Sequence, residues 1–153
     1  MAAGLSVAQL DDAAELALIA RDLCDRAAGL AQADAAAYGA VLSAKRDRDA
    51  EPEEKRRRVE QALVEATEVP LQLMELGAAV CELAARIAEE GNANLLGDAV
   101  AAALLAEAAV RADGALVVNN LGTAPDRERL GRSARALARA KASAAKAEKA
   151  MKR

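Results

Sequence analysis

The chain has 153 residues, which is enough for one domain with a substantial buried core. Hydrophobic residues make up 54% and charged residues 29%, so the composition excludes an intrinsically disordered chain. The absence of histidine excludes Ser-His-Asp and Cys-His catalysis and leaves acid–base chemistry to Asp, Glu, Lys or Tyr. The net charge is −3, but residues 126–153 are basic and the rest of the chain is acidic.

The sequence predicts an all-α protein, with a single domain over residues 1–153 built as an up-and-down bundle of long, Ala-rich helices. Alanine is the best helix former, and aromatic residues make up only 1% of the chain. The first helix is expected from about Ala8 to Lys45, because apolar residues recur there at three- and four-residue steps. A charged linker, residues 46–51, follows it.

The second helix is expected from Pro52, which suits the first turn of a helix, to Glu90, with Gly91 as its C-cap. Pro70 lies in the middle of this segment. Because proline removes one backbone hydrogen bond and clashes with the carbonyl one turn back, we expect the helix to kink or break there.

The third helix is expected over residues 98–122, and the Asp-Gly pair at 113–114 can interrupt it. The fourth, basic helix is expected over residues 125–149, with its cap in the segment 123–126. The third segment is apolar on nearly every side, which is typical of a helix in the middle of a bundle. We therefore interpret it as the spine of a helical oligomer or the wall of a site.

Cys24 and Cys81 are far apart and match no zinc or redox spacing, so we expect two buried, structural thiols in a cytoplasmic protein that binds no metal. The longest uncharged apolar run, residues 99–106, is too short to cross a membrane. The first residues also lack the basic segment of a signal peptide.

Three segments and their order resemble the cyclodeaminase/cyclohydrolase family of folate enzymes, which occurs as the C-terminal domain of formimidoyltransferase-cyclodeaminase and as free-standing methenyltetrahydrofolate cyclohydrolases. The segments are AQADAAAYGAV (31–41), PEEKRRRVEQALVEATEVPLQL (52–73) and GNANLLGDAVAAALLAEAAVR (91–111). Asn120-Leu121 resembles the end of the family's closing signature. The resemblance extends from the start of the chain to about residue 125.

This resemblance implies a helical homodimer that takes a tetrahydrofolate derivative as substrate and holds no tightly bound cofactor. Two reactions are implied: cyclodeamination of 5-formimidoyltetrahydrofolate to 5,10-methenyltetrahydrofolate plus ammonia, or hydrolysis of the methenyl bridge to 10-formyltetrahydrofolate. The family's proton donor/acceptor is an Asp whose counterpart here is Asp34, in Asp34-Ala-Ala-Ala-Tyr38. The sequence departs from the family in lacking its Gly-rich N-terminal turn and most of the helix that follows.

Asp34, Tyr38 and Lys45 are spaced to share one helix face. A carboxylate among alanines is expected to be poorly hydrated, which favours its protonated form. Tyr38 can hydrogen-bond this carboxylate or stack on a pterin, and Lys45 can attract the folate's carboxylates. The alternatives are a surface acid, an aromatic at the edge of the core and a solvated charge.

Asp98 is a further candidate for substrate binding, with a helix N-cap as the alternative. The remaining candidates are polar residues that either contact the folate or have a structural role: Asn92 and Asn94 in the loop, Arg111 paired with Glu107, and Asn120 near the helix end.

A second interpretation of the chain is a non-catalytic helical homodimer or accessory subunit, favoured by the missing Gly-rich turn. The basic segment, residues 126–153, can attract the polyglutamate chain of a folate. We expect no nucleic-acid partner, because a single aromatic residue offers no platform for base stacking. We expect no membrane partner, because the apolar side of this segment carries alanine rather than bulky residues.

Overall fold

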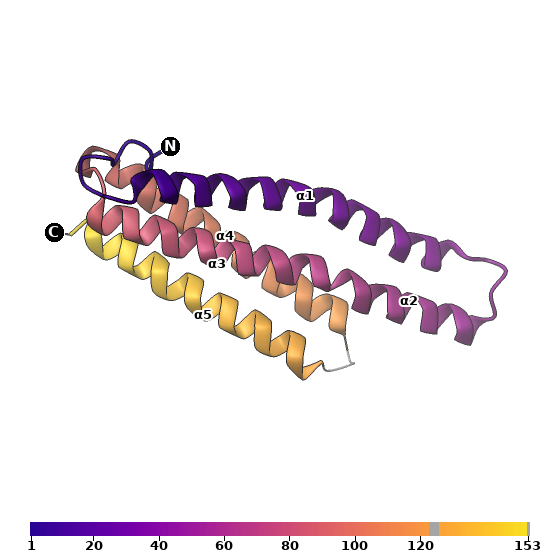
Figure 1. Cartoon of the computed structure of the whole chain (residues 1–153). Helices are drawn as coiled ribbons and strands as arrows, with labels where there is room; N and C mark the ends of the chain where they lie inside the picture. Colours follow the sequence, from indigo (N-terminus) through magenta and orange to yellow (C-terminus); the bar gives the residue numbers. More distant parts are fainter. Residues whose placement is uncertain (123–125, 153) are drawn as a thin grey trace.

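The structure is a computed structural model that describes residues 1–122 and 126–152. The described residues form five α-helices and no strand, which confirms an all-α up-and-down bundle (Figure 1). In chain order these helices are α1 (Ala13–Arg46), α2 (Pro52–Ala66), α3 (Glu68–Glu90), α4 (Leu96–Leu121) and α5 (Arg127–Ala150), with a 3-10 turn, η1 (Ala93–Leu95), before α4.

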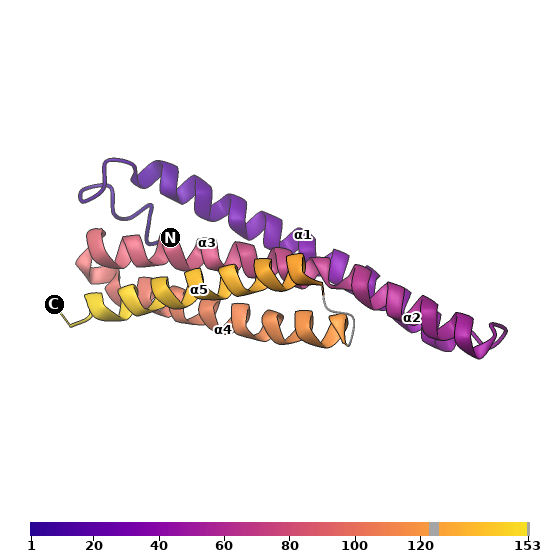
Figure 2. The ribbon, with the colours of Figure 1, turned by 90° about the horizontal axis from the view of Figure 1, so that it is seen from below.

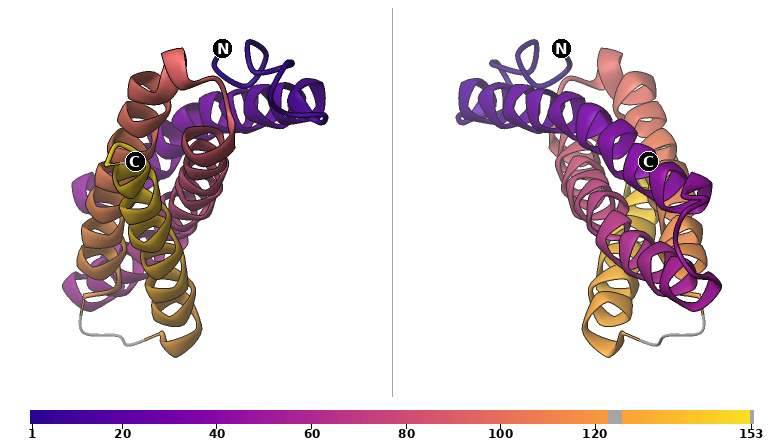
Figure 3. Two further views of the ribbon diagram at one scale, coloured as in Figure 1. Left: turned by 90° about the vertical axis from the view of Figure 1, so that its left-hand side faces the viewer. Right: turned by 90° about the vertical axis from the view of Figure 1, so that its right-hand side faces the viewer.

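Three helices, α3, α4 and α5, pack into the body of the molecule, and α1 and α2 form a hairpin whose tip projects beyond it (Figures 1 and 2). Figure 3 shows α5 lying against α3 and α4 along its length. The core of this body combines long side chains on α3 and α4 with alanines on α5, which let the helices approach closely: Leu71, Met74, Val110, Val117, Ala136 and Ala140.

The expected second helix is divided at Thr67 into α2 and α3, one turn before Pro70. Pro70 has no N–H to donate to the carbonyl of Ala66, and its ring crowds that carbonyl, so the break falls before the proline rather than at it. Thr67 keeps a helical backbone, and α2 continues the line of α3 (Figure 1). The expected end at Glu90 and the Gly91 C-cap are confirmed, and the Gly91 N–H donates to Ile87 O at 2.9 Å.

The prediction that 113–114 interrupts the third helix is wrong, because α4 runs unbroken through both residues. Gly114 allows close packing here rather than a turn, since a Cβ at this position would lie 3.3 Å from Cε of Met74 on α3. α4 also begins at Leu96, two residues earlier than expected.

The predicted first helix begins at Ala13 rather than near Ala8. The preceding residues form turns that are tied to the α3–α4 connection: Ser6 Oγ accepts a hydrogen bond from Asn92 N at 3.0 Å, and Leu5 O accepts one from Asn92 Nδ2 at 3.3 Å. At the start of α1, Asp12 and Arg86 form a two-pronged ion pair of 2.7 and 3.0 Å. These contacts hold residues 1–12 away from the axis of α1.

The basic helix α5 is capped by Asp126, whose Oδ1 accepts from Arg129 N at 3.0 Å. The expected start at Pro125 and the cap at Thr123 lie outside the described residues. Arg132 of α5 bridges Glu68 and Glu75 of α3, with N–O distances of 2.9 to 3.2 Å, and it holds the pKa of the Glu68 carboxyl below its usual range. Part of the basic charge of this segment is thus directed at α3.

The expectation for the cysteines is half right. Cys81 is buried, its Sγ lies 3.4 Å from Ala103 O, and burial raises the pKa of its thiol to about 11. Cys24 is exposed, because the preceding residue Leu23 takes the inward position on α1.

The helix α4 is covered on one side only. Its buried side packs on α3 and α5, while the opposite side exposes small and apolar residues, among them Leu105 at 73% exposure and Leu116 at 48%. Within the described part of the chain, residues 93–121 form the one helix long and apolar enough to cross a membrane, by length and composition only. Here it packs in the body of the bundle. The prediction that this helix is enclosed on every side is not met within a single chain.

Candidate functional site around Asp34

Helix α1 faces the rest of the molecule with one stripe of residues at alternating three- and four-residue steps. Every position of this stripe is buried or half-buried except Asp34, which is also its only charged residue. The stripe comprises Ala13, Leu16, Ala20, Leu23, Ala27, Leu30, Asp34, Ala37, Val41 and Ala44. A carboxylate in an otherwise apolar inward stripe is where a functional group is expected, because solvation alone favours the outer face.

The side chain of Asp34 is exposed, so it is not poorly hydrated in the single chain as the sequence predicted. Tyr38, one turn further on, is 61% exposed, which removes the alternative of an aromatic at the edge of the core. Both side chains are therefore free to contact a ligand or a second molecule.

Asp113 on α4 is the acid that sequence reasoning missed. It is half-buried, and burial, together with the charge of Asp34, raises the pKa of its carboxyl to about 6. Because an Asp-Gly pair is a common turn signal, the sequence alone favours a break in the helix over a functional acid at this position. Helix periodicity could have identified Asp113. It lies eleven residues after Ala102 and seven residues before Asn120, so all three residues share one side of α4.

A cavity of about 280 Å³ lies near the N-terminal end of α1, between α1, α3, α4 and the first residues of the chain. Asp98 lines it together with Ala20 of α1 and Ala102 of α4. Asp98 is exposed in the first turn of α4, and the N-cap position belongs to Leu95, so the N-cap alternative is wrong. The cavity is mainly apolar, and among the described residues that line it Asp98 has the only charged side chain.

Two of the other candidates, Asn92 and Arg111, have structural partners. Asn92 caps η1 by accepting from Asn94 N at 3.0 Å, while the Asn94 side chain is exposed. Arg111 forms an ion pair with the buried Glu107 one turn earlier, as its structural alternative predicted.

Asn120 has a role that the sequence did not suggest. Its Nδ2 donates to Ala66 O at 3.5 Å. This is the carbonyl that loses its helical partner because Pro70 has no N–H. Asn120 therefore supplies a donor to the break between α2 and α3.

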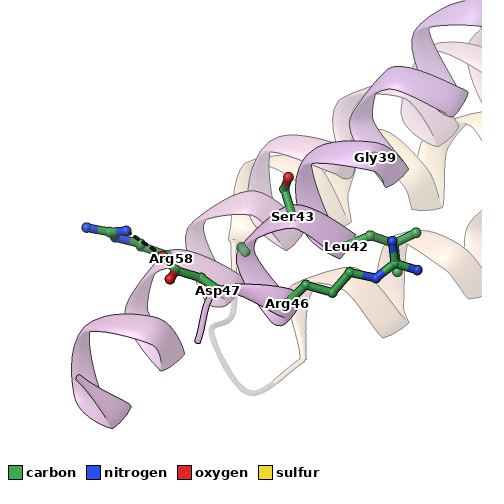
Figure 4. Close-up of a pocket in the computed structure, with 7 residues that line it drawn as sticks. Gly39, Leu42, Ser43, Arg46, Asp47 and Arg58 are labelled. Carbon is green, nitrogen blue, oxygen red and sulfur yellow. Dashed lines mark hydrogen bonds and ion pairs between the residues drawn. The ribbon is translucent and has the colours of Figure 1, made fainter. Parts of the chain in front are cut away.

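Lys45 is exposed near the tip of the α1–α2 hairpin, far along α1 from the cavity at Asp98. An open hollow of about 610 Å³ at this tip is lined by Arg46, Asp47 and Arg58 among others (Figure 4). Arg58 Nη1 lies 3.0 Å from Asp47 Oδ2, and the Arg46 side chain extends away from that pair (Figure 4). Arg46 and Arg58 therefore do not converge on one point (Figure 4).

One chain thus brings only part of the predicted site together. Asn92, Asn94 and Asp98 lie at the end of the bundle where α3 leads into α4, and Lys45 lies toward the opposite end. Asp34 is close enough to Asp113 for its charge to add to the raised pKa of the Asp113 carboxyl, so these two groups belong to one candidate site.

The sequence profile of the formiminotransferase-cyclodeaminase family matches residues 2–139. The chain belongs to this family. Its fold is similar to the crystal structure of formiminotetrahydrofolate cyclodeaminase from Thermotoga maritima, with a TM-score of 0.65 and 23% sequence identity. The alignment covers 93% of this chain and 67% of the Thermotoga chain. No curated protein sequence matches the chain.

Family membership confirms the resemblance that the three sequence segments indicated, and it connects the chain with folate metabolism. At 23% identity, the likeness to the Thermotoga protein shows a shared fold. The role of each predicted site residue stays a prediction.

Proposed function

We propose that this chain is a folate enzyme that converts 5-formimidoyltetrahydrofolate to 5,10-methenyltetrahydrofolate and ammonia, with Asp34 as the proton donor/acceptor. The observation that carries the proposal is the position of Asp34, the single charged residue of the inward stripe of α1 in a member of the formiminotransferase-cyclodeaminase family. Tyr38, one turn away and exposed, is proposed as a folate contact. Asp98, which lines the apolar cavity, is proposed as another.

The reaction closes a ring, because the second folate nitrogen attacks the formimidoyl carbon and ammonia leaves. It needs one proton removed from the attacking nitrogen and one delivered to the departing nitrogen. A positioned carboxyl group contributes roughly 10²- to 10⁴-fold to such proton transfers. Orientation of the flexible formimidoyl group beside the attacking nitrogen contributes further.

The test is to incubate the purified chain with 5-formimidoyltetrahydrofolate and follow both the absorbance of the methenyl bridge and the release of ammonia. We expect the two to appear in equal amounts. Loss of the bridge from added 5,10-methenyltetrahydrofolate, without any activity on the formimidoyl substrate, would assign the hydrolase reaction instead. No turnover and no folate binding would favour the non-catalytic helical protein.

We further propose that the active form is a homodimer in which the exposed side of α4 packs on a second copy. This side carries small residues that permit close helix approach, and large apolar side chains such as Leu105 would otherwise face water. A second copy also supplies cover for a helix whose sequence is apolar on nearly every side. A cytoplasmic location and a polyglutamylated substrate stay predictions from the sequence.

Replacing Leu105 with glutamate should therefore convert the dimer to a monomer, because a buried, unpaired carboxylate opposes the contact. The measurement is the molar mass in solution by light scattering, at several protein concentrations. The matched control is Leu18→Glu, an equally exposed leucine at 69% on the outer side of α1. A monomeric wild-type chain, or a Leu105→Glu variant that stays dimeric, would contradict this interface.

A further inference from the structure

The apolar cavity near Asp98 gives a common reference level for residues on α1 and on α4. Ala20 of α1 and Ala102 of α4 both line this cavity, and α3 forms its floor. Because α1 and α4 both run antiparallel to α3, they run parallel to each other along it (Figure 1). Positions on the two helices can therefore be compared by counting residues from this shared level.

Asp34 lies fourteen residues after Ala20 on α1, and Asp113 lies eleven residues after Ala102 on α4. At 1.5 Å per residue these steps advance about 21 Å along α1 and about 17 Å along α4. Both steps are close to whole numbers of turns, so each carboxyl group stays on the side that its helix presents to the cavity. The two acids thus face each other across α3 at nearly the same level.

Asp113 and Asp34 lie in different surroundings, which differ first in burial. Asp113 is half-buried and Asp34 is exposed. Burial raises the pKa of the Asp113 carboxyl to about 6, and the negative charge of Asp34 adds to the rise. Among the other charged groups on the packed helices, Glu68 and Glu75 form ion pairs with Arg132, and Glu107 forms one with Arg111.

We propose that Asp113 is a second catalytic residue, the general acid that works opposite Asp34. This inference rests on the proposed function. An amidine such as the formimidoyl group is protonated at neutral pH. As the second folate nitrogen attacks the carbon, a C–N bond forms and the C=N electron pair moves to the terminal nitrogen.

Ionised Asp34 then accepts the proton of the attacking nitrogen, and protonated Asp113 donates a proton to the terminal nitrogen. Ammonia leaves with the electron pair of the breaking C–N bond, while the other folate nitrogen completes the methenyl cation. One proton is taken up and one is given, so the overall charge is unchanged. A single proton transfer from Asp34 to Asp113 resets the pair, which is the general advantage of two carboxyl groups in unlike environments.

The decisive experiment compares the pH dependence of kcat for 5-formimidoyltetrahydrofolate in the wild type and in Asp113→Asn, with Glu89→Gln as a control at an exposed position on α3. A general acid must be protonated, so wild-type kcat should fall as pH rises through the pKa of Asp113. We expect Asp113→Asn to lower kcat by roughly 10²- to 10⁴-fold and to abolish this alkaline limb, with the acidic limb kept. A variant that keeps both limbs would overturn the acid role.

The pairing is tested without activity by NMR titration of carboxyl-labelled aspartate. The Asp113 carboxyl of the wild type should titrate near pH 6, and its pKa should fall in Asp34→Asn because the neighbouring charge is gone. An unchanged Asp113 titration in this variant would overturn the pairing. If the wild type does not turn over the substrate, the proposed function fails and the acid role with it, whereas the titration still decides whether the two carboxyl groups interact.

Discussion

Replacing Asp34 with asparagine should lower kcat for 5-formimidoyltetrahydrofolate by roughly 10²- to 10⁴-fold and change the Kd for folate little. Asparagine has nearly the same shape but cannot accept or carry a proton at neutral pH. The affected step is the proton transfer at the attacking nitrogen, so the loss should fall on kcat rather than on binding. The measurement is the initial rate of methenyl absorbance at saturating substrate, together with a separate folate titration.

The control for this variant is Asp25→Asn, an exposed acid on the same helix but outside the inward stripe. It removes the same charge from α1 and should keep wild-type kcat. Because Asp34 is exposed and forms no ion pair among the described residues, its replacement should leave the thermal midpoint nearly unchanged. An Asp34→Asn variant with full activity would contradict a proton-transfer role for this residue.

Much of the helical architecture follows from local sequence signals. Pro52 at the start of α2, Gly91 at the end of α3 and the apolar periodicity of α1 each act within one or two turns, so they can be seen without the fold. The start of α1 was misplaced because it depends on a distant contact. Ser6 and Asn92, which hold the first residues away from the helix axis, are 86 residues apart.

The site was harder to predict because its residues take their roles from neighbours on other helices. Asn120 looked like a cap or a ligand contact, but its partner is the Ala66 carbonyl, 54 residues away. Asp113 looked like part of a turn, but burial in the fold, with a further contribution from the charge of Asp34, raises the pKa of its carboxyl to about 6. Asp34 could be identified because the segment that carries the family resemblance, Asp34-Ala-Ala-Ala-Tyr38, lies on a single helix.

A second large effect, on the stability of the fold, is expected from a substitution at the contact between α3 and α4. Gly77 on α3 lies against Val110 on α4, and a Cβ at Gly77 would be 2.6 Å from Cγ2 of Val110. Val110 is fully buried and β-branched, so it has little freedom to move aside. We expect Gly77→Ala to destabilise the fold, because overpacking costs about 1–3 kcal/mol and exceeds the gain of up to about 1 kcal/mol from replacing glycine in a helix.

Gly29→Ala on α1 separates these two opposing contributions. Nothing lies within 4 Å of a Cβ at Gly29, so this variant should gain about 0.5–1 kcal/mol from helix propensity alone. The difference in unfolding free energy between the two variants therefore measures the packing cost at the α3–α4 contact. Urea unfolding at one fixed protein concentration provides both values, because the stability of a dimer depends on concentration. A Gly77→Ala variant as stable as Gly29→Ala would show that α3 and α4 lie further apart than this contact requires.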